Sequence, residues 1–285
     1  WNSDLRSDES PAIVELKTQL GPRISERDPW RFERESTLRA LLAHFRVASL
    51  EGFGVEHDSA VVPAAGALIE YLQETQKTAC QHVLRIERVD PSRFLVLDRA
   101  TSSCLELFRT QREGREEGTL IDVLDATCTP MGARRLRDWL AHPLREVEPI
   151  LHRQRAVAEL HGAPFVREEL RTRLGKVLDV ERLAAKIATG RAHARDLRGL
   201  ADSLDLVGQI REQLASSYSA YLAELRERLD PLRDVVERIQ STLADDPPLA
   251  LKEGGLVRTG FDARLDELRA ILGEGKSWMA RFQAE

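Results

Sequence analysis

The sequence is poor in the residues that disulfide-stapled, metal-binding and membrane-spanning proteins require. It has three cysteines, Cys80, Cys104 and Cys128, which are widely spaced and form no C-x-x-C pair. This pattern argues against a disulfide framework or a cysteine-based metal site, and it favours a reducing compartment. No apolar run approaches the roughly 20 residues of a membrane-spanning helix, and no signal-peptide pattern is present. We therefore expect a cytoplasmic protein that makes no contact with a membrane.

An excess of charge of either sign is also missing. The 42 basic and 47 acidic residues leave a net charge of −5 at pH 7, although charged residues make up 31% of the chain. Mixed charges at this density are typical of solvated helix faces, and they argue against a strongly basic nucleic-acid domain or an acidic disordered tail. A chain of 285 residues is long enough for about two domains, and it can bury a core without disulfides or metal ions.

Apolar residues at helical spacing dominate most of the chain. They predict helices near 33–45, 63–76, 148–161, 165–175, 180–189 and 193–215, and from about 262 onward. Two small β-hairpins are predicted from alternating or turn-flanked segments, one pairing residues 82–89 with 94–97 and the other within residues 249–258. Residues 12–16 fit either a short strand or a helical turn. The predicted fold class is therefore mainly α, with long helices and small β-hairpins.

A heptad-like seam marks the region after residue 220. Its apolar residues step alternately by three and four positions, at Leu222, Leu225, Leu229, Leu232, Val236, Ile239 and Leu243. Pro231 lies inside this seam, and a proline in the interior of a helix costs about 3 kcal/mol or more. We therefore predict two helices that share one apolar face, with Asp230 as the cap and Pro231 as the first position of the second helix.

Two further helix starts carry capping signals. Thr119 is followed three residues later by Asp122, which is the pattern of a capping box. Thr129 precedes Pro130, and proline is favoured at the first position of a helix. Trp139, which belongs to this second helix, is predicted to lie on its buried face.

The local motifs that could carry chemistry are weak. The segment Gly273-Glu-Gly275-Lys276-Ser277 resembles the end of a phosphate-binding loop, but Ala270 stands where that motif needs its first glycine. The segment also follows a helical run, so two glycines in an exposed helix are the better interpretation. No H-E-x-x-H or G-x-S-x-G motif occurs, and the seven histidines are predicted to be solvated or to cap helices. We predict no catalytic, cofactor-binding or metal-binding residues.

Arginine supplies nearly all of the positive charge, with 36 of the 42 basic residues. Several arginines cluster on the predicted helical segments 134–137 and 226–238. There they alternate with Asp and Glu at helical neighbour spacing, which favours ion pairs within each helix over contacts with DNA phosphates. A helical domain that itself binds the nucleic-acid backbone is the alternative function.

The middle of the chain resembles one known family. Its characteristic segments, in order, are Phe94-Leu-Val-Leu-Asp-Arg-Ala-Thr-Ser-Ser-Cys-Leu-Glu-Leu, Gly118-Thr-Leu-Ile-Asp-Val-Leu-Asp-Ala-Thr-Cys-Thr-Pro-Met-Gly-Ala-Arg-Arg-Leu-Arg-Asp-Trp-Leu, His142-Pro-Leu and Arg153-Gln-Arg-Ala-Val. Together they resemble the core, or lever, domain of the bacterial MutS family of mismatch-repair proteins. Earlier segments beginning at Leu50 and Ala64 resemble the end of the family's connector domain, and residues 254–269 resemble the approach to its long lever helix. The resemblance covers roughly residues 28–285.

This resemblance implies two domains. Residues 1–92 would form the C-terminal part of a connector domain with an α/β fold, and residues 93–285 would form a helical core or lever domain. The sequence would be a piece of a longer DNA-binding ATPase that binds mismatched duplex DNA and forms a homodimer. The clamp, the mismatch-reading domain and the sites for ATP and magnesium would lie outside this chain. In agreement, none of the eight phenylalanines is followed two residues later by Glu, as the family's mismatch-reading motif requires.

The role implied for this piece is that of a non-catalytic scaffold, which transmits conformational change between the clamp and the ATPase domain. The resemblance also implies a docking surface for the partner protein MutL, on the helix before the turn Gly52-Phe-Gly. The aligned positions here are Arg39 and Ala40, whereas enterobacterial members of the family carry paired glutamines. A MutS paralogue that lacks the mismatch-reading half is a further alternative, and the connector-like residues 33–76 argue against it.

Overall fold

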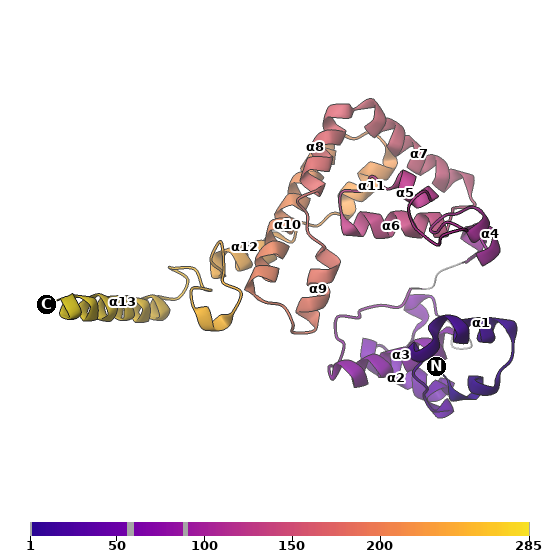
Figure 1. Cartoon of the computed structure of the whole chain (residues 1–285), viewed down its shortest axis with the longest axis horizontal. Helices are drawn as coiled ribbons and strands as arrows, with labels where there is room; N and C mark the ends of the chain where they lie inside the picture. Colours follow the sequence, from indigo (N-terminus) through magenta and orange to yellow (C-terminus); the bar gives the residue numbers. More distant parts are fainter. Residues whose placement is uncertain (1, 56–59, 88–90, 285) are drawn as a thin grey trace. The chain divides into compact units, whose positions relative to one another are not determined.

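A computed structural model describes residues 2–55, 60–87 and 91–284 of the chain (Figure 1). The chain divides into two compact units, which are called unit 1 (Trp1–Asp90) and unit 2 (Pro91–Glu285) below. Helices account for most of the described backbone of both units, so the predicted mainly α fold class is confirmed. No helix within the described ranges is both long enough and apolar enough to cross a membrane.

Unit 1 is built around a pair of helices. Its helices are α1 (Pro11–Leu20), α2 (Arg34–Phe45) and α3 (Val61–Gln76), joined by short 3-10 turns. The long α2 and α3 pack against each other, and their inner faces together with the intervening loop form one buried aliphatic cluster: Leu41, Leu50, Val55, Val62 and Ile69. The bounds of α2 and α3 agree closely with the apolar periodicity of the sequence.

The close approach of α2 and α3 depends on a glycine. A Cβ placed on Gly66 would lie 2.4 Å from the Cβ of Thr37 and 2.7 Å from its Cα and carbonyl oxygen. Such distances cannot be relieved by turning a side chain, because two of the three atoms belong to the backbone. Thr37 is itself fully buried, and its hydroxyl donates to the carbonyl of Glu33 at 2.8 Å. The Thr37 hydroxyl is therefore paired at this crossing point.

The expectation of an α/β remnant in unit 1 is wrong for the residues that the structure describes. They contain no sheet, and the only strand-like pairing is an isolated parallel bridge between Asn2 and Arg27. Residues 12–16, for which a strand and a helical turn were both open, lie in α1, where Pro11 occupies the first helical position. Proline has no N–H to leave unpaired there, and its fixed φ suits the first turn.

Unit 2 is a set of helices around one long member, α10. Its helices are α4 (Arg99–Cys104), α5 (Leu120–Leu124), α6 (Pro130–Ala141), α7 (Val147–Gly162), α8 (Pro164–Leu174), α9 (Val180–Ala188), α10 (Ala194–Gln213), α11 (Ala220–Arg228), α12 (Arg233–Thr242) and α13 (Ala263–Ala284). Helix α10 contacts α8, α9 and α12, and α7 contacts α8 and α11.

The predicted helix starts in unit 2 are confirmed with one adjustment. The Thr119 hydroxyl accepts from the backbone N–H of Asp122 at 3.4 Å, but the Asp122 carboxylate accepts from Gly118 instead of Thr119. The Thr129 hydroxyl accepts from Gly132, with Pro130 in the first position. Trp139 is not a core residue, because its ring is only half-buried and the guanidinium of Arg153 lies 3.7 Å from the ring centroid.

The seam after residue 220 is divided between two helices, as predicted, but the break falls two residues later. Helix α11 ends at Arg228, and α12 begins at Arg233, with Leu232 at the N-cap in a left-handed conformation (φ 46°). The seam also serves two separate clusters rather than one shared face. Its first half packs with α7, α8 and α10, while Val236 and Ile239 pack on Ala201 and Leu204 of α10. Leu232 is 42% exposed and belongs to neither cluster.

Neither predicted hairpin forms in the part of the chain that the structure describes. Phe94 instead forms an isolated bridge with Leu144, supported by the bond from Leu95 N–H to the carbonyl of Pro143 at 2.8 Å. In the second segment, Val257 bridges to Leu243 rather than to residues 249–251. Alternation and turn residues indicate an extended backbone, but they do not say which other segment will accept its hydrogen bonds. Residues 88 and 89 of the first predicted strand, and residue 90 at the predicted turn, lie outside the described ranges.

Candidate functional site

Arg39 and Ala40 lie next to each other on α2, the helix that the sequence assigns to partner docking. Arg39 is exposed, and its Nε donates to the carbonyl of Glu35 one turn earlier at 3.4 Å. Ala40 is half-buried and lines a pocket, whereas Arg39 is not among the lining residues. The structure therefore gives the two predicted residues different surroundings: one faces solvent and the other faces a cavity.

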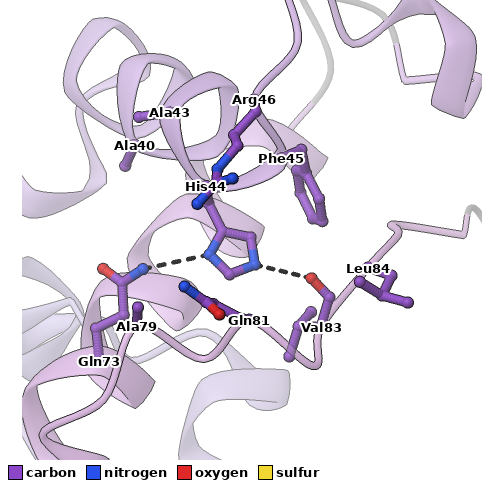
Figure 2. Close-up of a pocket in the computed structure, with 10 residues that line it drawn as sticks. All are labelled: Ala40, Ala43, His44, Phe45, Arg46, Gln73, Ala79, Gln81, Val83 and Leu84. Atoms are coloured by element: carbon purple, nitrogen blue, oxygen red, sulfur yellow. Dashed lines mark hydrogen bonds between the residues drawn. The ribbon is translucent and has the colours of Figure 1, made fainter.

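The pocket lies where the last turn of α2, the end of α3 and the segment 79–84 meet (Figure 2). Its volume is about 550 Å³, and its lining residues are Ala40, Ala43, His44, Phe45, Arg46, Gln73, Ala79, Gln81, Val83 and Leu84. Small side chains at Ala40, Ala43 and Ala79 account for the open space. The lining contains one guanidinium and no carboxylate, so the pocket favours a ligand with negative charge.

His44 forms hydrogen bonds to two of the elements that make up the walls of the pocket. Its Nε2 lies 2.8 Å from the carbonyl oxygen of Val83, and its Nδ1 lies 3.3 Å from the Gln73 side-chain nitrogen. A carbonyl can only accept, so Nε2 must carry the proton, and neutral Nδ1 then accepts from the amide of Gln73. The ring also meets Phe45 edge-on, with centroids 4.8 Å apart. One side chain thus links α2 to both α3 and the 79–84 segment.

Both helices that border the pocket end on a residue in the left-handed region. Arg46 (φ 55°) ends α2 and Lys77 (φ 51°) ends α3, while buried Cys80 (φ 48°) turns the chain towards the pocket. A side-chain-bearing residue in this region costs about 1 kcal/mol or more. At Arg46 the turn is held by backbone bonds to the carbonyl of Leu42, one of them from Val47 at 3.2 Å. The backbone at Arg46 therefore makes a fixed turn at the rim of the pocket.

The other sequence candidates do not form a chemical site. The Gly273–Ser277 segment lies within α13, where backbone N–H groups are used by the helix and cannot wrap a phosphate. His193 is the N-cap of α10 and forms a capping box with Asp196, which confirms the capping role expected for some histidines. Across the described ranges, no group of three or more His, Cys, Asp or Glu side chains is placed to hold a metal ion.

The arginines of α6, α11 and α12 are largely paired with carboxylates, but Arg134, Arg137 and Arg233 find their partners on other segments of unit 2, whereas their spacing predicted pairs within one helix. Arg134 makes two bonds of 2.8 and 2.9 Å to Asp179 and one of 2.5 Å to Glu181, which joins α6 to the start of α9. The Arg134 guanidinium lowers the pKa of Asp179 to about 2. Further pairs are Arg137–Glu116, Arg226–Glu227, Arg228–Glu224 and Arg233–Glu212. Guanidiniums held in this way are less available to DNA phosphates.

Comparison with known proteins identifies the family. A family model described as MutS domain II matches residues 2–84, and one described as MutS domain III matches residues 100–283. The chain belongs to the MutS family. Curated relatives named DNA mismatch repair protein MutS include those of Salinibacter ruber (42% identical over 92% of this chain), Symbiobacterium thermophilum (42% over 96%) and Chlorobaculum tepidum (40% over 93%). The chain spans about 30% of the length of these relatives, at 29%, 31% and 30%.

The pocket lies wholly within the part that matches MutS domain II, and sequence reasoning did not find it. The residues predicted to be functional in this region are Arg39 and Ala40, whereas His44 was predicted only to be solvated or to cap a helix, and residues 82–84 only to form part of a strand. The signals present in the sequence were a histidine in the last turn of one helix and a strand-like segment shortly after the next. Their meeting depends on how α2 and α3 pack, which no local pattern reports.

Proposed function

We propose that this chain is the mechanical part of a MutS-type mismatch-repair protein. In this proposal it carries no catalytic site or cofactor of its own, and it transmits conformational change between the DNA-gripping clamp and the ATPase domain. ATP, magnesium and mismatched DNA would be bound by other parts of a cytoplasmic, homodimeric protein. The membership of the MutS family supports the mismatch-repair role, and the arrangement of charges in unit 2 supports the mechanical one.

The supporting observation is an ionic joint between α10 and the loop before α13, formed by Arg198, Asp245 and Arg258. The Asp245 carboxylate pairs with Arg198 of α10 at 2.9 Å and also with Arg258. From the other side, Arg269 of α13 donates to the carbonyl of Val257 at 2.9 Å. A single carboxylate thus connects the central helix of unit 2 to the loop that holds the start of α13. Such a joint can pass a movement of one helix to the other.

The test is a chimera in which this chain replaces the matching segment of the Salinibacter ruber MutS protein. We expect Asp245→Ala to weaken the effect of ATP on mismatched-DNA binding, while the affinity measured without ATP stays the same. Asp246→Ala is the matched control, because Asp246 is 91% exposed and lies 3.7 Å from its nearest arginine. An unchanged ATP effect in a folded Asp245→Ala chimera would refute the role of the joint.

We also propose that α2 contributes to docking of MutL through Arg39 and Ala40. Two observations support this proposal. The chain belongs to the MutS family, and Arg39 is exposed on α2 and forms no buried ion pair among the described residues. Arg39→Glu is expected to weaken binding of MutL to the chain, whereas Arg112→Glu, on an exposed loop of unit 2, is expected to leave it unchanged. Surface plasmon resonance with immobilised chain would measure both, and equal affinities for the two variants would count against this docking site.

Direct binding of the nucleic-acid backbone is the competing function. The carboxylate partners of the arginines on α6 and α11 speak against it, because binding to phosphates would require these pairs to be broken. Fluorescence anisotropy of the isolated chain with duplex DNA separates the two proposals. The mechanical proposal expects no salt-sensitive binding at sub-micromolar concentrations, and the competing function requires it.

A further inference from the structure

The first turn of α10 is capped by a histidine, a side chain that changes its charge near neutral pH. The Nδ1 atom of His193 lies 3.2 Å from the backbone nitrogen of Asp196, and the Asp196 carboxylate lies 3.2 Å from the backbone nitrogen of His193. A backbone N–H can only donate, so Nδ1 must be an unprotonated acceptor and the ring must be neutral, with its proton on Nε2. The favoured N-cap residues Ser, Thr and Asn accept the same bond without this requirement.

A proton on Nδ1 of His193 removes this bond. The N–H of Asp196 belongs to the first turn of a helix, where no carbonyl of an earlier turn is available to accept it. A positive charge at a helix N-terminus is also unfavourable, because the helix dipole is positive there. Histidine ordinarily takes up its proton at about pH 6.5. The cap is therefore expected above this range and lost below it.

The charged groups around the cap are of both signs. Lys186 of α9 pairs with the Asp196 carboxylate at 2.8 Å, and this contact lowers the pKa of Asp196, so the carboxylate stays ionised where histidine titrates. The same carboxylate lies 3.4 Å from Nε2 of His193 and attracts the protonated ring. Charged groups on the neighbouring segments are Arg191, Arg195, Arg198, Asp245 and Asp246, and the last two pair with Arg198 and Arg195. Protonation therefore replaces the bond to the Asp196 N–H by an ion pair with a carboxylate that Lys186 already binds.

The capped turn of α10 also holds the segment that follows α12. Arg195 lies in this turn, and its Nε donates to the carbonyl of buried Pro247 at 2.8 Å. Two residues before Pro247, Asp245 forms the ionic joint with Arg198 and Arg258. The first turn of α10 is thus linked to the joint through three adjacent residues of one short segment.

We propose that His193 is a proton-sensitive cap, which loosens the ionic joint as the pH falls from about 7.5 to about 5.5. With a neutral ring, the cap bond holds the first turn of α10, and this turn holds Pro247 and the joint. With a protonated ring the cap bond is absent, the first turn opens more often, and the contacts of Arg195 and Arg198 weaken with it. This switch acts on the structure of unit 2, whether or not the joint serves mismatch repair.

His142, at the opposite end of a helix, is an internal control. It ends α6, and its Nδ1 lies 3.2 Å from the carbonyl oxygen and 3.1 Å from a carboxylate oxygen of Asp138. Both oxygens accept, so Nδ1 already carries a proton, and a further proton on Nε2 leaves these contacts intact. Positive charge is also favourable at a helix C-terminus. Acid should therefore preserve the end of α6 while it opens the start of α10.

The test is hydrogen exchange of the full 285-residue chain, followed by NMR at pH 7.5 and pH 5.5. Protection factors are compared, because they correct for the effect of pH on the exchange chemistry itself. We expect the Asp196 amide to lose protection about fivefold at pH 5.5, the usual effect of removing one N-cap. The Ala244 amide, which donates to the carbonyl of Leu256 at 2.9 Å beside the joint, should lose protection with it. The His142 amide, which donates to the carbonyl of Asp138 at 2.9 Å, should lose none.

Two variants separate the cap from other effects of acid. His193→Asn keeps a cap that does not titrate, so protection at Asp196 and Ala244 should be the same at both pH values. His193→Ala has no cap, so both amides should show the low-pH behaviour already at pH 7.5. Circular dichroism checks that both variants fold. An equal loss of protection in the His193→Asn chain, no loss in the unsubstituted chain, or a loss at Asp196 that leaves Ala244 unchanged would each overturn the proposal.

Discussion

The two units of the chain differ in what fills their interiors. In unit 1 the buried cluster consists of aliphatic side chains that are at most 4% exposed, and the buried Thr37 bonds within its own helix. In unit 2 two ionisable carboxylates, Glu159 and Asp196, are buried between helices beside the apolar clusters. The first interior should therefore respond mainly to changes of volume, and the second also to changes of charge.

The two buried carboxylates of unit 2 each bind polar groups of a neighbouring helix, Glu159 as a cap and Asp196 as the partner of a lysine. Glu159 of α7 accepts from the backbone N–H groups of Tyr218 at 3.0 Å and Ser219 at 2.8 Å, at the start of α11. Asp196 of α10 pairs with Lys186 of α9 at 2.8 Å. Buried carboxylates thus help to hold the helices of unit 2 together, as close packing holds those of unit 1.

The sharpest test of packing in unit 1 is Gly66→Ala. The added methyl group would collide with the backbone of Thr37, so α2 and α3 must separate and open the cluster between them. We expect a loss of about 3 kcal/mol in the free energy of unfolding of unit 1, near the upper end of the range for overpacking. Hydrogen exchange, followed separately for α3 and α10, would show the loss in unit 1 only.

Gly52→Ala is the matched control for this substitution. A Cβ at Gly52 meets no atom within 4 Å, and its φ is not in the left-handed region. The control should therefore unfold like the unsubstituted chain. A Gly66→Ala protein with unchanged exchange in α3 would mean that the two helices are not in close contact, and the contrast between the units would fail.

The corresponding test in unit 2 is Glu159→Ala. Removal of the carboxylate leaves the buried N–H of Ser219 and the neighbouring N–H of Tyr218 without their acceptors. An unpaired buried donor costs roughly 1–3 kcal/mol, and we expect a total loss of about 2 kcal/mol. The start of α11 should show the largest gain in hydrogen exchange. Glu168→Ala, which removes an exposed carboxylate on α8, should have no measurable effect.

Periodicity and capping signals were sufficient to predict most helices but not their partners. The bounds of α2, α8, α9 and α10 follow from apolar spacing that belongs to each segment alone. The cap that Glu159 provides joins residues 60 positions apart, and nothing near residue 219 announces it. The pocket beside Ala40 could not be predicted from local sequence either, because it forms only where α2, α3 and the 79–84 segment meet. Long-range pairing is decided by competition among all segments, so a strand-like pattern such as 94–97 can bridge to a segment other than the expected one, as Phe94 does to Leu144.

Acid is expected to destabilise unit 2 more than unit 1, but by less than Glu159→Ala does. The backbone donors of Ser219 and Tyr218 outweigh burial and lower the pKa of Glu159, and Lys186 lowers the pKa of Asp196. Groups with a lowered pKa in the folded state stabilise it above their ordinary pKa values and lose this contribution as the pH falls through the folded values. We therefore expect unit 2 to lose stability from about pH 4.5 downward. The loss is smaller than for Glu159→Ala, because a protonated carboxyl still fills the site and accepts one bond.

Unit 1 provides the internal control for this acid effect. Its Glu74 also has a lowered pKa, caused mainly by the bond to Arg31, but that carboxylate is 52% exposed. Exposed ion pairs contribute little to stability, so unit 1 should change less over the same pH range. Urea unfolding at pH 7 and pH 3.5, monitored by hydrogen exchange in each unit, would measure the difference. A larger loss in unit 1 would reverse the assignment of charge and packing to the two interiors.

The smallest expected effect concerns the half-buried ring of Trp139 on α6. Its face is covered by the guanidinium of Arg153 at 3.7 Å, while Arg135 lies 6.0 Å from the ring centroid. A cation–π contact at a partly exposed site contributes about 1 kcal/mol, which corresponds to a fall in Tm of about 2–4 °C in a unit of this size. We therefore expect Arg153→Ala to lower the Tm of unit 2 by this amount and Arg135→Ala to lower it less. In a Trp139→Leu background the effect of Arg153→Ala should shrink, because the ring that attracts the guanidinium is gone. If the effect persists there, Arg153 stabilises α7 through its aliphatic stem, and the contribution of charge to unit 2 is confined to the buried caps.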